Sequence, residues 1–188
     1  RLTAKVQSLK IGDPFKEGIA YGPMISERFL KTHLGHLDSL VEKHHTLPLG
    51  KGGWIGHGAD WNHFEGDAEN GFFARPVFVT GVKMTDKIYG TETFGPLFNV
   101  LKYSDMDEAM AMANNHGYGL SSSIYTNDPQ KVYRFKTQIT AGMTSINNST
   151  TGAEAHLPFG GNGKSGNGGR QSGIWVIDQF TKWQSVNW

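Results

Sequence analysis

Residues 97–146 decide the fold class, and they read LFNVLKYSDMDEAMAMANNHGYGLSSSIYTNDPQKVYRFKTQITAGMTSI. Within this segment, residues 97–103, 121–126 and 143–147 are short runs that we predict as strands. Residues 105–116 and 128–138 lie between them and are predicted as helices. Strands that alternate with helices of about ten residues indicate βαβ units. We therefore predict an α/β fold with a parallel or mixed sheet flanked by helices.

Both helices of this segment have recognisable starts. Ser104 and Asp107 resemble a capping box at the start of the first helix. Asp128 followed by Pro129 is typical of an N-cap with proline at the first helical position. These local signals support the helical assignment independently of the apolar spacing.

The flanking sequence extends the pattern in both directions. Residues 1–9 are predicted as a helix, and Ser26 is predicted to cap a helix over residues 27–43. Residues 48–71 are expected to form a hairpin or loop, and residues 72–82 a strand with Pro76 at an edge or bulge. A short helix over 174–180 and a last strand over 182–188 complete the prediction. No linker stands out, so we expect one domain.

Composition excludes several classes of protein. The 188 residues carry a net charge of only +1, so no basic surface for nucleic acid is expected. No apolar run reaches the ~20 residues of a membrane helix. The chain has no cysteine, which excludes disulfides, thiolate metal sites and a cysteine nucleophile within it. We expect a cytoplasmic protein. Because the first residue is not Met and a helix is already under way, we expect the chain to begin inside a longer protein.

Five motifs follow one another along the chain, and their order is more specific than any one of them. They are Gly12-Asp13-Pro14 with Gly22-Pro23, then Glu92 to Pro96 (ETFGP), then Asn114 to Ser122 (NNHGYGLSS), then Ala141-Gly142 with Ile146-Asn147, and last Pro158 to Gly161 (PFGG) leading to Lys164-Ser165-Gly166. In this order and spacing the chain resembles the aldehyde dehydrogenase superfamily over nearly its whole length.

The resemblance implies a reaction and a place in a larger protein. Family members oxidise an aldehyde to a carboxylic acid with NAD or NADP, using a cysteine nucleophile and a glutamate base. By family spacing, both residues lie upstream of Arg1, so we assign no catalytic residue to this chain. Residues 1–180 would be the C-terminal part of the catalytic domain, with the Rossmann-type cofactor domain outside the chain. The chain alone is predicted to be inactive.

Glu92 and Phe94 are the candidate cofactor-binding residues. In an extended segment, residues two apart point to the same side, and Gly95 before Pro96 favours extension. The resemblance implies that the carboxylate holds the nicotinamide ribose and that the ring packs by the nicotinamide. The alternative is a surface glutamate beside a core phenylalanine.

Gly152, Ala153 and Phe159 are the candidate substrate-binding residues. The resemblance implies that residues 151–159 line the substrate entrance, and residues 147–161 are most similar to the antiquitin-type branch, which acts on aminoadipate semialdehyde. Small residues permit close approach, and adjacent backbone N–H groups form an anion nest for a substrate carboxylate. Phe159 would wall the aldehyde pocket. The alternative is a plain loop with Phe159 in the core.

Two other patterns are weaker. Gly161, Gly163 and Gly166 match a dinucleotide fingerprint literally, but a long loop rather than a strand precedes them, so we assign their glycines to tight turns. The eight histidines include His33 and His36 at helical spacing and the pair His44-His45. No cysteine or ordered carboxylate completes a familiar ligand set, so no metal is predicted.

Residues 181–188 alternate large apolar and polar side chains. The resemblance implies a strand that pairs across a subunit boundary, so a homo-oligomer, a dimer or tetramer, is expected; an ordinary edge strand is the alternative. The only other expected partner is a small aldehyde. A non-catalytic interaction or assembly module of the same fold is the alternative function.

Overall fold

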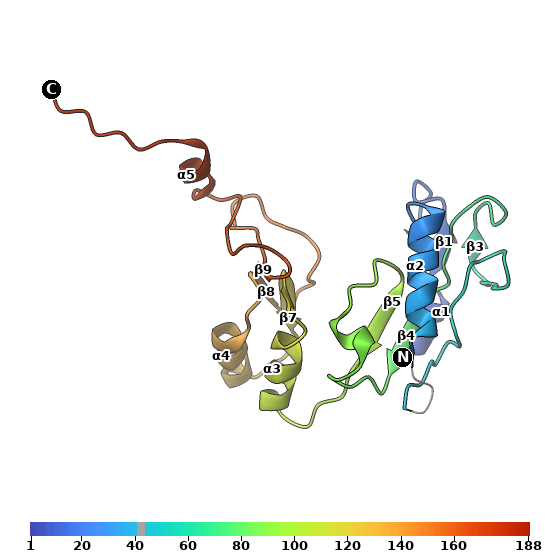
Figure 1. Cartoon of the computed structure of the whole chain (residues 1–188). Helices are drawn as coiled ribbons and strands as arrows, with labels where there is room; N and C mark the ends of the chain where they lie inside the picture. The colour runs from blue at the N-terminus through green and yellow to red at the C-terminus, as the bar shows by residue number, and fades with distance from the viewer. Residues whose placement is uncertain (41–43) are drawn as a thin grey trace. The chain divides into compact units, whose positions relative to one another are not determined.

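A computed structural model of the chain describes residues 1–40 and 44–188 and divides into two compact units, Arg1–Lys102 and Tyr103–Trp188 (Figure 1). This division was not anticipated from the sequence. The boundary falls in the short connection between β5 (Leu97–Val100) and α3 (Met106–Asn114), where no run of proline, glycine or serine marks it. Each unit is described by itself below.

The first unit contains two parallel sheets. Its elements are α1 (Leu2–Gln7), β1 (Lys10–Gly12), β2 (Ile19–Tyr21), α2 (Glu27–Asp38), β3 (Phe64–Glu65), β4 (Val77–Thr80), the 3-10 helix η1 (Lys87–Gly90) and β5. One sheet has the order β2-β1-β3, and β4 pairs with β5 in parallel.

The strand β4 is covered on both faces, as parallel strands usually are. Val77 and Val79 pack with Leu37 of α2, whereas Phe78, on the opposite face, packs with Val6 of α1. A third cluster combines Ile11, Ile55 and Phe73. The alternating side chains of one short strand thus join two helices to one sheet.

Residues 48–71 form a loop, as predicted, but the strand β3 inside it pairs with the distant β1. Two indoles hold this loop in place, one through a bond within the loop and one through a bond to the segment before β1. Trp54 Nε1 donates to the Gly71 carbonyl oxygen at 2.9 Å, and Trp61 Nε1 donates to the Leu9 carbonyl oxygen at 2.8 Å.

The second unit contains the alternating segment predicted at the outset. Its elements are α3, β6 (Tyr118–Gly119), β7 (Ser121–Ile124), α4 (Pro129–Gln138), β8 (Met143–Ile146), β9 (Asn162–Gly163) and α5 (Val176–Phe180). The strands β7 and β8 are parallel, and β6 pairs antiparallel with β9. The α/β class with parallel and mixed pairing is confirmed.

The helix starts agree with the sequence to different degrees. Asp128 caps α4, and its carboxylate accepts from the Gln130 and Lys131 N–H groups. Asp105, not Ser104, caps α3, because its carboxylate reaches the Glu108 N–H at 2.9 Å. Ser26 is the N-cap of α2 but makes no side-chain cap bond.

The helix α2 ends at Asp38, earlier than the predicted Lys43. Ser39 Oγ donates to the His36 carbonyl oxygen at 2.7 Å, and the Leu40 N–H turns back to the Leu37 carbonyl oxygen. These contacts close the last turn. Residues 41–43, which the prediction included, lie outside the described residues.

The predicted strand over residues 182–188 is absent, since no strand of the described chain pairs with it. Its side chains are exposed, including Trp183, Val186 and Trp188. A strand needs a partner for its backbone N–H and C=O groups. None of the described helices has the length and apolar character required to cross a membrane.

Candidate functional site

A cavity of ≈ 460 Å³ lies along β8 and the loop that follows it in the second unit. It brings together all three predicted substrate-binding residues, Gly152, Ala153 and Phe159. The remaining lining comes from β8 and from the loop, with Met143, Ile146 and Leu157 as apolar members and Ser149 and Glu154 as polar ones. The cavity lining therefore combines apolar and polar side chains.

The start of this loop is fastened to β7 by its serines. Ser121 and Ser123 point the same way because they are two residues apart in a strand. Ser123 Oγ donates to the Asn148 carbonyl oxygen at 2.6 Å, and Ser121 Oγ donates to the Thr150 carbonyl oxygen at 3.3 Å. The serine-rich strand thus positions the backbone that leads into Gly152.

Asn147 forms the corner between β8 and the loop. Its φ of 53° is in the left-handed region, which asparagine tolerates better than most residues. Its side-chain amide exchanges two hydrogen bonds with the backbone of Thr126, at 2.8 and 3.0 Å. The chain direction after β8 is therefore fixed by one side chain.

Gly152 and Ala153 lie at the exposed tip of the loop. Gly152 has a φ of 92°, and a Cβ there would meet no atom within 4 Å. The positive φ, rather than crowding, therefore favours glycine here. In the part of the chain that the structure describes, the N–H groups of Gly152 and Ala153 have no protein acceptor.

Phe159 is half-buried and held by its backbone. It forms an antiparallel bridge with Gln171, with Phe159 N–H to O at 2.6 Å and Gln171 N–H to O at 2.8 Å. The backbone of Phe159 is thus held by a bridge beside the cavity that this residue lines.

The glycine-rich segment after Phe159 closes on itself. The Arg170 guanidinium donates to the carbonyl oxygens of Gly168 and Gly169 and to Asn162 Oδ1, at 2.9, 3.0 and 3.0 Å. Gly163 has a φ of 59° within β9, which agrees with the turn role expected of these glycines. The Arg170 guanidinium thus occupies the inside of this loop and is bonded to the loop's own oxygen atoms.

Glu92 and Phe94 lie in the first unit, in the turn before β5. Both side chains are exposed, and the Phe94 ring is 68% exposed. The alternative of a surface glutamate beside a core phenylalanine is therefore wrong for Phe94, which does not lie in the core. The extended geometry expected for this pair is wrong at Phe94, whose φ is 45°. Gly95 packs directly against the buried His33 ring, and the Pro96 carbonyl oxygen accepts from the Val77 N–H at 2.8 Å.

This backbone strain is informative. A bulky residue with positive φ is an outlier that costs on the order of 1–3 kcal/mol and persists only where its surroundings enforce it. Here the enforced conformation displays an aromatic ring to solvent instead of burying it. Such outliers cluster at ligand-binding positions.

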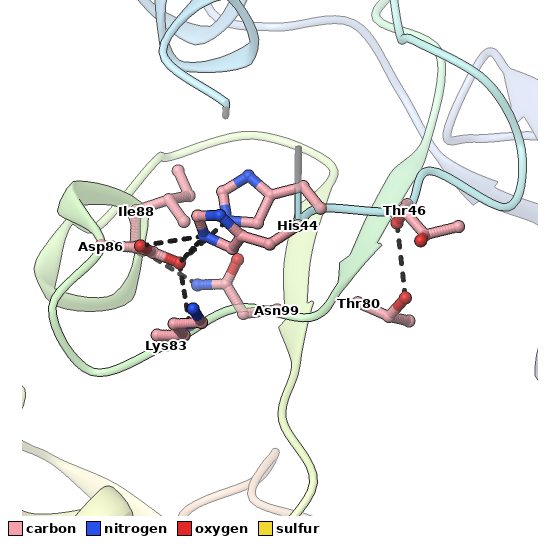
Figure 2. Close-up of polar contacts among 8 residues, drawn as sticks. His44, Thr46, Thr80, Lys83, Asp86, Ile88 and Asn99 are labelled. Atoms are coloured by element: carbon pink, nitrogen blue, oxygen red, sulfur yellow. Dashed lines mark hydrogen bonds and ion pairs between the residues drawn. The ribbon is translucent and has the colours of Figure 1, made fainter. Parts of the chain in front are cut away.

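A cluster that sequence analysis missed also lies in the first unit. Asp86 Oδ2 accepts hydrogen bonds from His44 Nε2 at 3.0 Å and His45 Nε2 at 2.9 Å (Figure 2). The Lys83 N–H donates to the same oxygen at 2.8 Å. Burial raises the pKa of Asp86, but these hydrogen bonds outweigh it and hold the pKa well below its usual range. The carboxylate is 41 residues from His45, so no local spacing could have revealed it.

The family model described as "Aldehyde dehydrogenase family" matches residues 1–186. The chain belongs to the aldehyde dehydrogenase family. Its motif order, its α/β architecture and its loop glycines all agree with that membership.

Curated relatives carry different substrate names. The chain is 31% identical over 186 residues to the aminoacetaldehyde dehydrogenase of Pseudomonas aeruginosa, covering 99% of the chain and 34% of that protein. It is 37% identical over 161 residues to the alpha-ketoglutarate semialdehyde dehydrogenase of Haloferax volcanii, covering 85% of the chain and 31% of that protein. The chain thus spans about a third of the length of these relatives.

Solved structures of aldehyde dehydrogenases share the fold. A putative member from Burkholderia cenocepacia aligns with 34% identity and a TM-score of 0.83 over 97% of this chain and 35% of that one. A Mycobacterium tuberculosis aldehyde dehydrogenase in complex with NAD+ aligns with 30% identity and a TM-score of 0.81 over 96% of this chain and 35% of that one.

The two predicted groups of site residues lie in different units. Glu92 and Phe94 belong to the first unit, whereas Gly152, Ala153 and Phe159 share the cavity of the second. The absence of cysteine from the sequence means that this aldehyde dehydrogenase chain holds no thiol nucleophile.

Proposed function

We propose that this chain forms part of an NAD(P)-dependent aldehyde dehydrogenase whose substrates are amino-acid semialdehydes. The observation that carries the proposal is the cavity that Gly152, Ala153 and Phe159 line together. It pairs exposed backbone donors with an aromatic wall, which suits a substrate with an anionic end and an apolar carbon chain.

The overall reaction converts an aldehyde, water and NAD(P)+ into a carboxylate, NAD(P)H and protons. When bound, NAD(P)+ would supply the hydride acceptor for this oxidation. The chain has no cysteine, so the nucleophile of the family reaction must come from residues other than these 188. The role of this chain is to hold the two reactants.

Glu92 and Phe94 are the proposed cofactor contacts. An exposed carboxylate can accept hydrogen bonds from both ribose hydroxyls, and each charge-assisted bond contributes about 1.5–3 kcal/mol. The Phe94 ring, displayed by a strained backbone, offers an apolar face for the nicotinamide. Both side chains are accessible, so the residues present fit the group.

Gly152 and Ala153 are the proposed carboxylate contacts, through their unpaired N–H groups. The semialdehyde named for the Haloferax volcanii relative supports an anionic substrate end, whereas the aminoacetaldehyde of the Pseudomonas aeruginosa relative has none. Within semialdehydes, the similarity of residues 147–161 to antiquitin-type enzymes favours aminoadipate semialdehyde.

The carboxylate contact can be tested by titrating the stable product 2-aminoadipate into the chain and following the backbone amide signals by NMR. We expect the largest shifts at Gly152 and Ala153. Ala153→Pro removes one donor and should weaken binding at least tenfold, since about 1.4 kcal/mol corresponds to a factor of ten. Ala153→Ser retains the N–H and is the matched control. Equal affinity of both variants would contradict the proposal.

We expect the isolated chain to be inactive because it contains no cysteine. With NAD or NADP and any aldehyde, we expect no formation of reduced cofactor by absorbance, while NAD still shifts the amide signals of residues 92–95. Measurable turnover would show that another group serves as nucleophile. Absence of any cofactor-induced shift would favour the second candidate function, an assembly module without catalysis.

Assembly through residues 181–188 is the remaining part of the proposal. Trp183, Val186 and Trp188 are exposed and the segment is unpaired within the described chain, as expected of a strand that pairs across a subunit boundary. Deleting residues 181–188 should lower the mass measured by light scattering. An unchanged mass would refute the role of this segment.

A further inference from the structure

His44, His45 and Asp86, the histidine–aspartate cluster, have no part in the proposed oxidation of aldehydes. Each offers one ligand atom, and these atoms all lie within 4.8 Å of one another. We propose that the histidine–aspartate cluster binds a divalent transition-metal ion such as Zn²⁺.

The distances suit such an ion. Zn²⁺ binds imidazole nitrogen and carboxylate oxygen at about 2.0–2.2 Å, so ligand atoms around a tetrahedral ion lie roughly 3.3 Å apart. The two Nε2 atoms lie 3.0 and 2.9 Å from Asp86 Oδ2, and His44 Nε2 is also 3.2 Å from Oδ1. An outward movement of a few tenths of an ångström admits the ion. Each Nε2 must lose its proton to bind the metal, so the neutral ring then carries its proton on Nδ1 and any excess proton is released to solvent.

The ligand chemistry selects the kind of cation. Imidazole suits zinc, copper and nickel, whereas Mg²⁺ and Ca²⁺ prefer sets of oxygen ligands. Two imidazoles and one carboxylate leave a fourth tetrahedral position for water. The site is also accessible from solvent on one side, because the side chain of His44 is 28% exposed while those of His45 and Asp86 are 2% and 10% exposed.

Groups around the cluster hold its ligands in place. The Lys83 N–H fixes the carboxylate of Asp86 (Figure 2). Directly after His45, Thr46 pairs with Thr80 through backbone bonds of 3.0 and 2.9 Å. Gly81, with a φ of 81°, contacts the His44 carbonyl oxygen so closely that a Cβ would clash with it. Such outer contacts orient metal ligands and raise affinity.

The location suggests what the ion does. It would tie residues 44 and 45, which lie between α2 and β3, to the turn after β4, which leads through η1 to Glu92 and Phe94. The metal would thus clamp the turn that precedes the proposed cofactor contacts. This effect on the turn rests on the proposed function, but metal binding itself does not.

The test uses the tag-free full chain after treatment with EDTA and titration with ZnCl2 alone. We expect one equivalent to bind by calorimetry and the melting temperature to rise by about 5–10 °C at a hundredfold excess over Kd. Asp86→Asn retains a hydrogen-bond acceptor of the same shape but should weaken zinc binding at least tenfold. His63→Gln, which removes an exposed histidine outside the cluster, should bind like the original chain.

Equal zinc affinity of Asp86→Asn and the original chain would overturn the proposal, as would no binding at all. If Asp86→Asn does not fold, Co²⁺ added to the original chain gives an independent answer. Intense d–d bands of a four- or five-coordinate ion, displaced by Zn²⁺, support the site. A spectrum of hydrated Co²⁺ alone means that the cluster is only hydrogen-bonded. Binding of Mg²⁺ as strong as that of Zn²⁺ would contradict the choice of ion.

Discussion

The two compact units are stabilised differently. Among the described residues, every buried apolar side chain except Met110 and Phe135 belongs to the first unit, which also holds all three core clusters. In the second unit, side-chain hydrogen bonds to backbone and close contacts between backbones take that place. A unit with so little buried apolar surface responds to different substitutions from one with a packed core.

The largest effect is expected from the core of the first unit. Leu30→Ala in α2 removes a side chain with no exposed surface and should lower the free energy of unfolding by about 2–5 kcal/mol. Ile146→Ala in the second unit, where the side chain is 41% exposed, should cost about 1 kcal/mol or less. Urea unfolding followed by residue-resolved hydrogen exchange measures both. Losses of equal size would remove the contrast between the units.

Next in size is a pH effect within the first unit. Burial, together with the charge of His36, lowers the pKa of His33 from 6.5 to about 4, and neither ring nitrogen has a partner among the described residues. The unfolded state therefore binds more protons between pH 6.5 and 4, so stability is complete above this window and falls as the pH decreases through it.

The expected loss from His33 is about 3 kcal/mol across the window, at 1.36 kcal/mol for each pKa unit. His33→Leu should flatten this part of the curve of unfolding free energy against pH. A curve of unchanged slope in His33→Leu would assign the dependence to other groups.

Glycine contacts provide the corresponding test for the second unit. A Cβ at Gly142 would clash with the Gly160 carbonyl oxygen, so Gly142→Ala should cost about 1–3 kcal/mol. Gly35 of α2 has no atom within 4 Å of an added Cβ, and Gly35→Ala should stabilise by up to about 1 kcal/mol. Thermal melting of the two variants checks the opposite signs, and destabilisation in both would mean that helix propensity does not explain Gly35.

The smallest difference concerns helix caps. Asp128→Ala removes two hydrogen bonds at the start of α4 and should cost about 1 kcal/mol. Ser26→Ala should cost only a few tenths, because Ser26 makes no side-chain cap bond. Chemical unfolding of both variants, compared with the original chain, resolves this difference. A larger loss at Ser26 would place the stronger cap in the first unit.

Local signals predicted local structure well. The Asp128-Pro129 start of α4 follows from side-chain chemistry within four residues, and the alternation of strands and helices follows from periodicity. The end of α2 was missed because Ser39 closes the last turn through its own side chain. Pairing of β3 with β1 was missed because it joins segments far apart in the sequence.

The candidate sites show the same difference between features set by local sequence and features set by long-range contacts. The substrate residues lie within eight positions of one another on one loop, and the structure gathers them at one cavity. The left-handed backbone of Phe94 could not be predicted, since the turn that contains it packs at Gly95 against His33, which is distant in the sequence. Asp86 was missed for a similar reason, because only the folded chain brings it to His44 and His45.

The indoles that fasten residues 48–71 have a practical consequence. Trp54 and Trp61 are partly buried and bonded to backbone in the first unit, whereas the other three tryptophans, at 175, 183 and 188, are exposed in the second. Iodide should therefore quench the emission of the second group selectively. Tryptophan fluorescence can therefore follow two events separately. The emission of Trp54 and Trp61 reports whether the core of the first unit is intact, and the emission of the other three reports whether the C-terminal segment becomes buried.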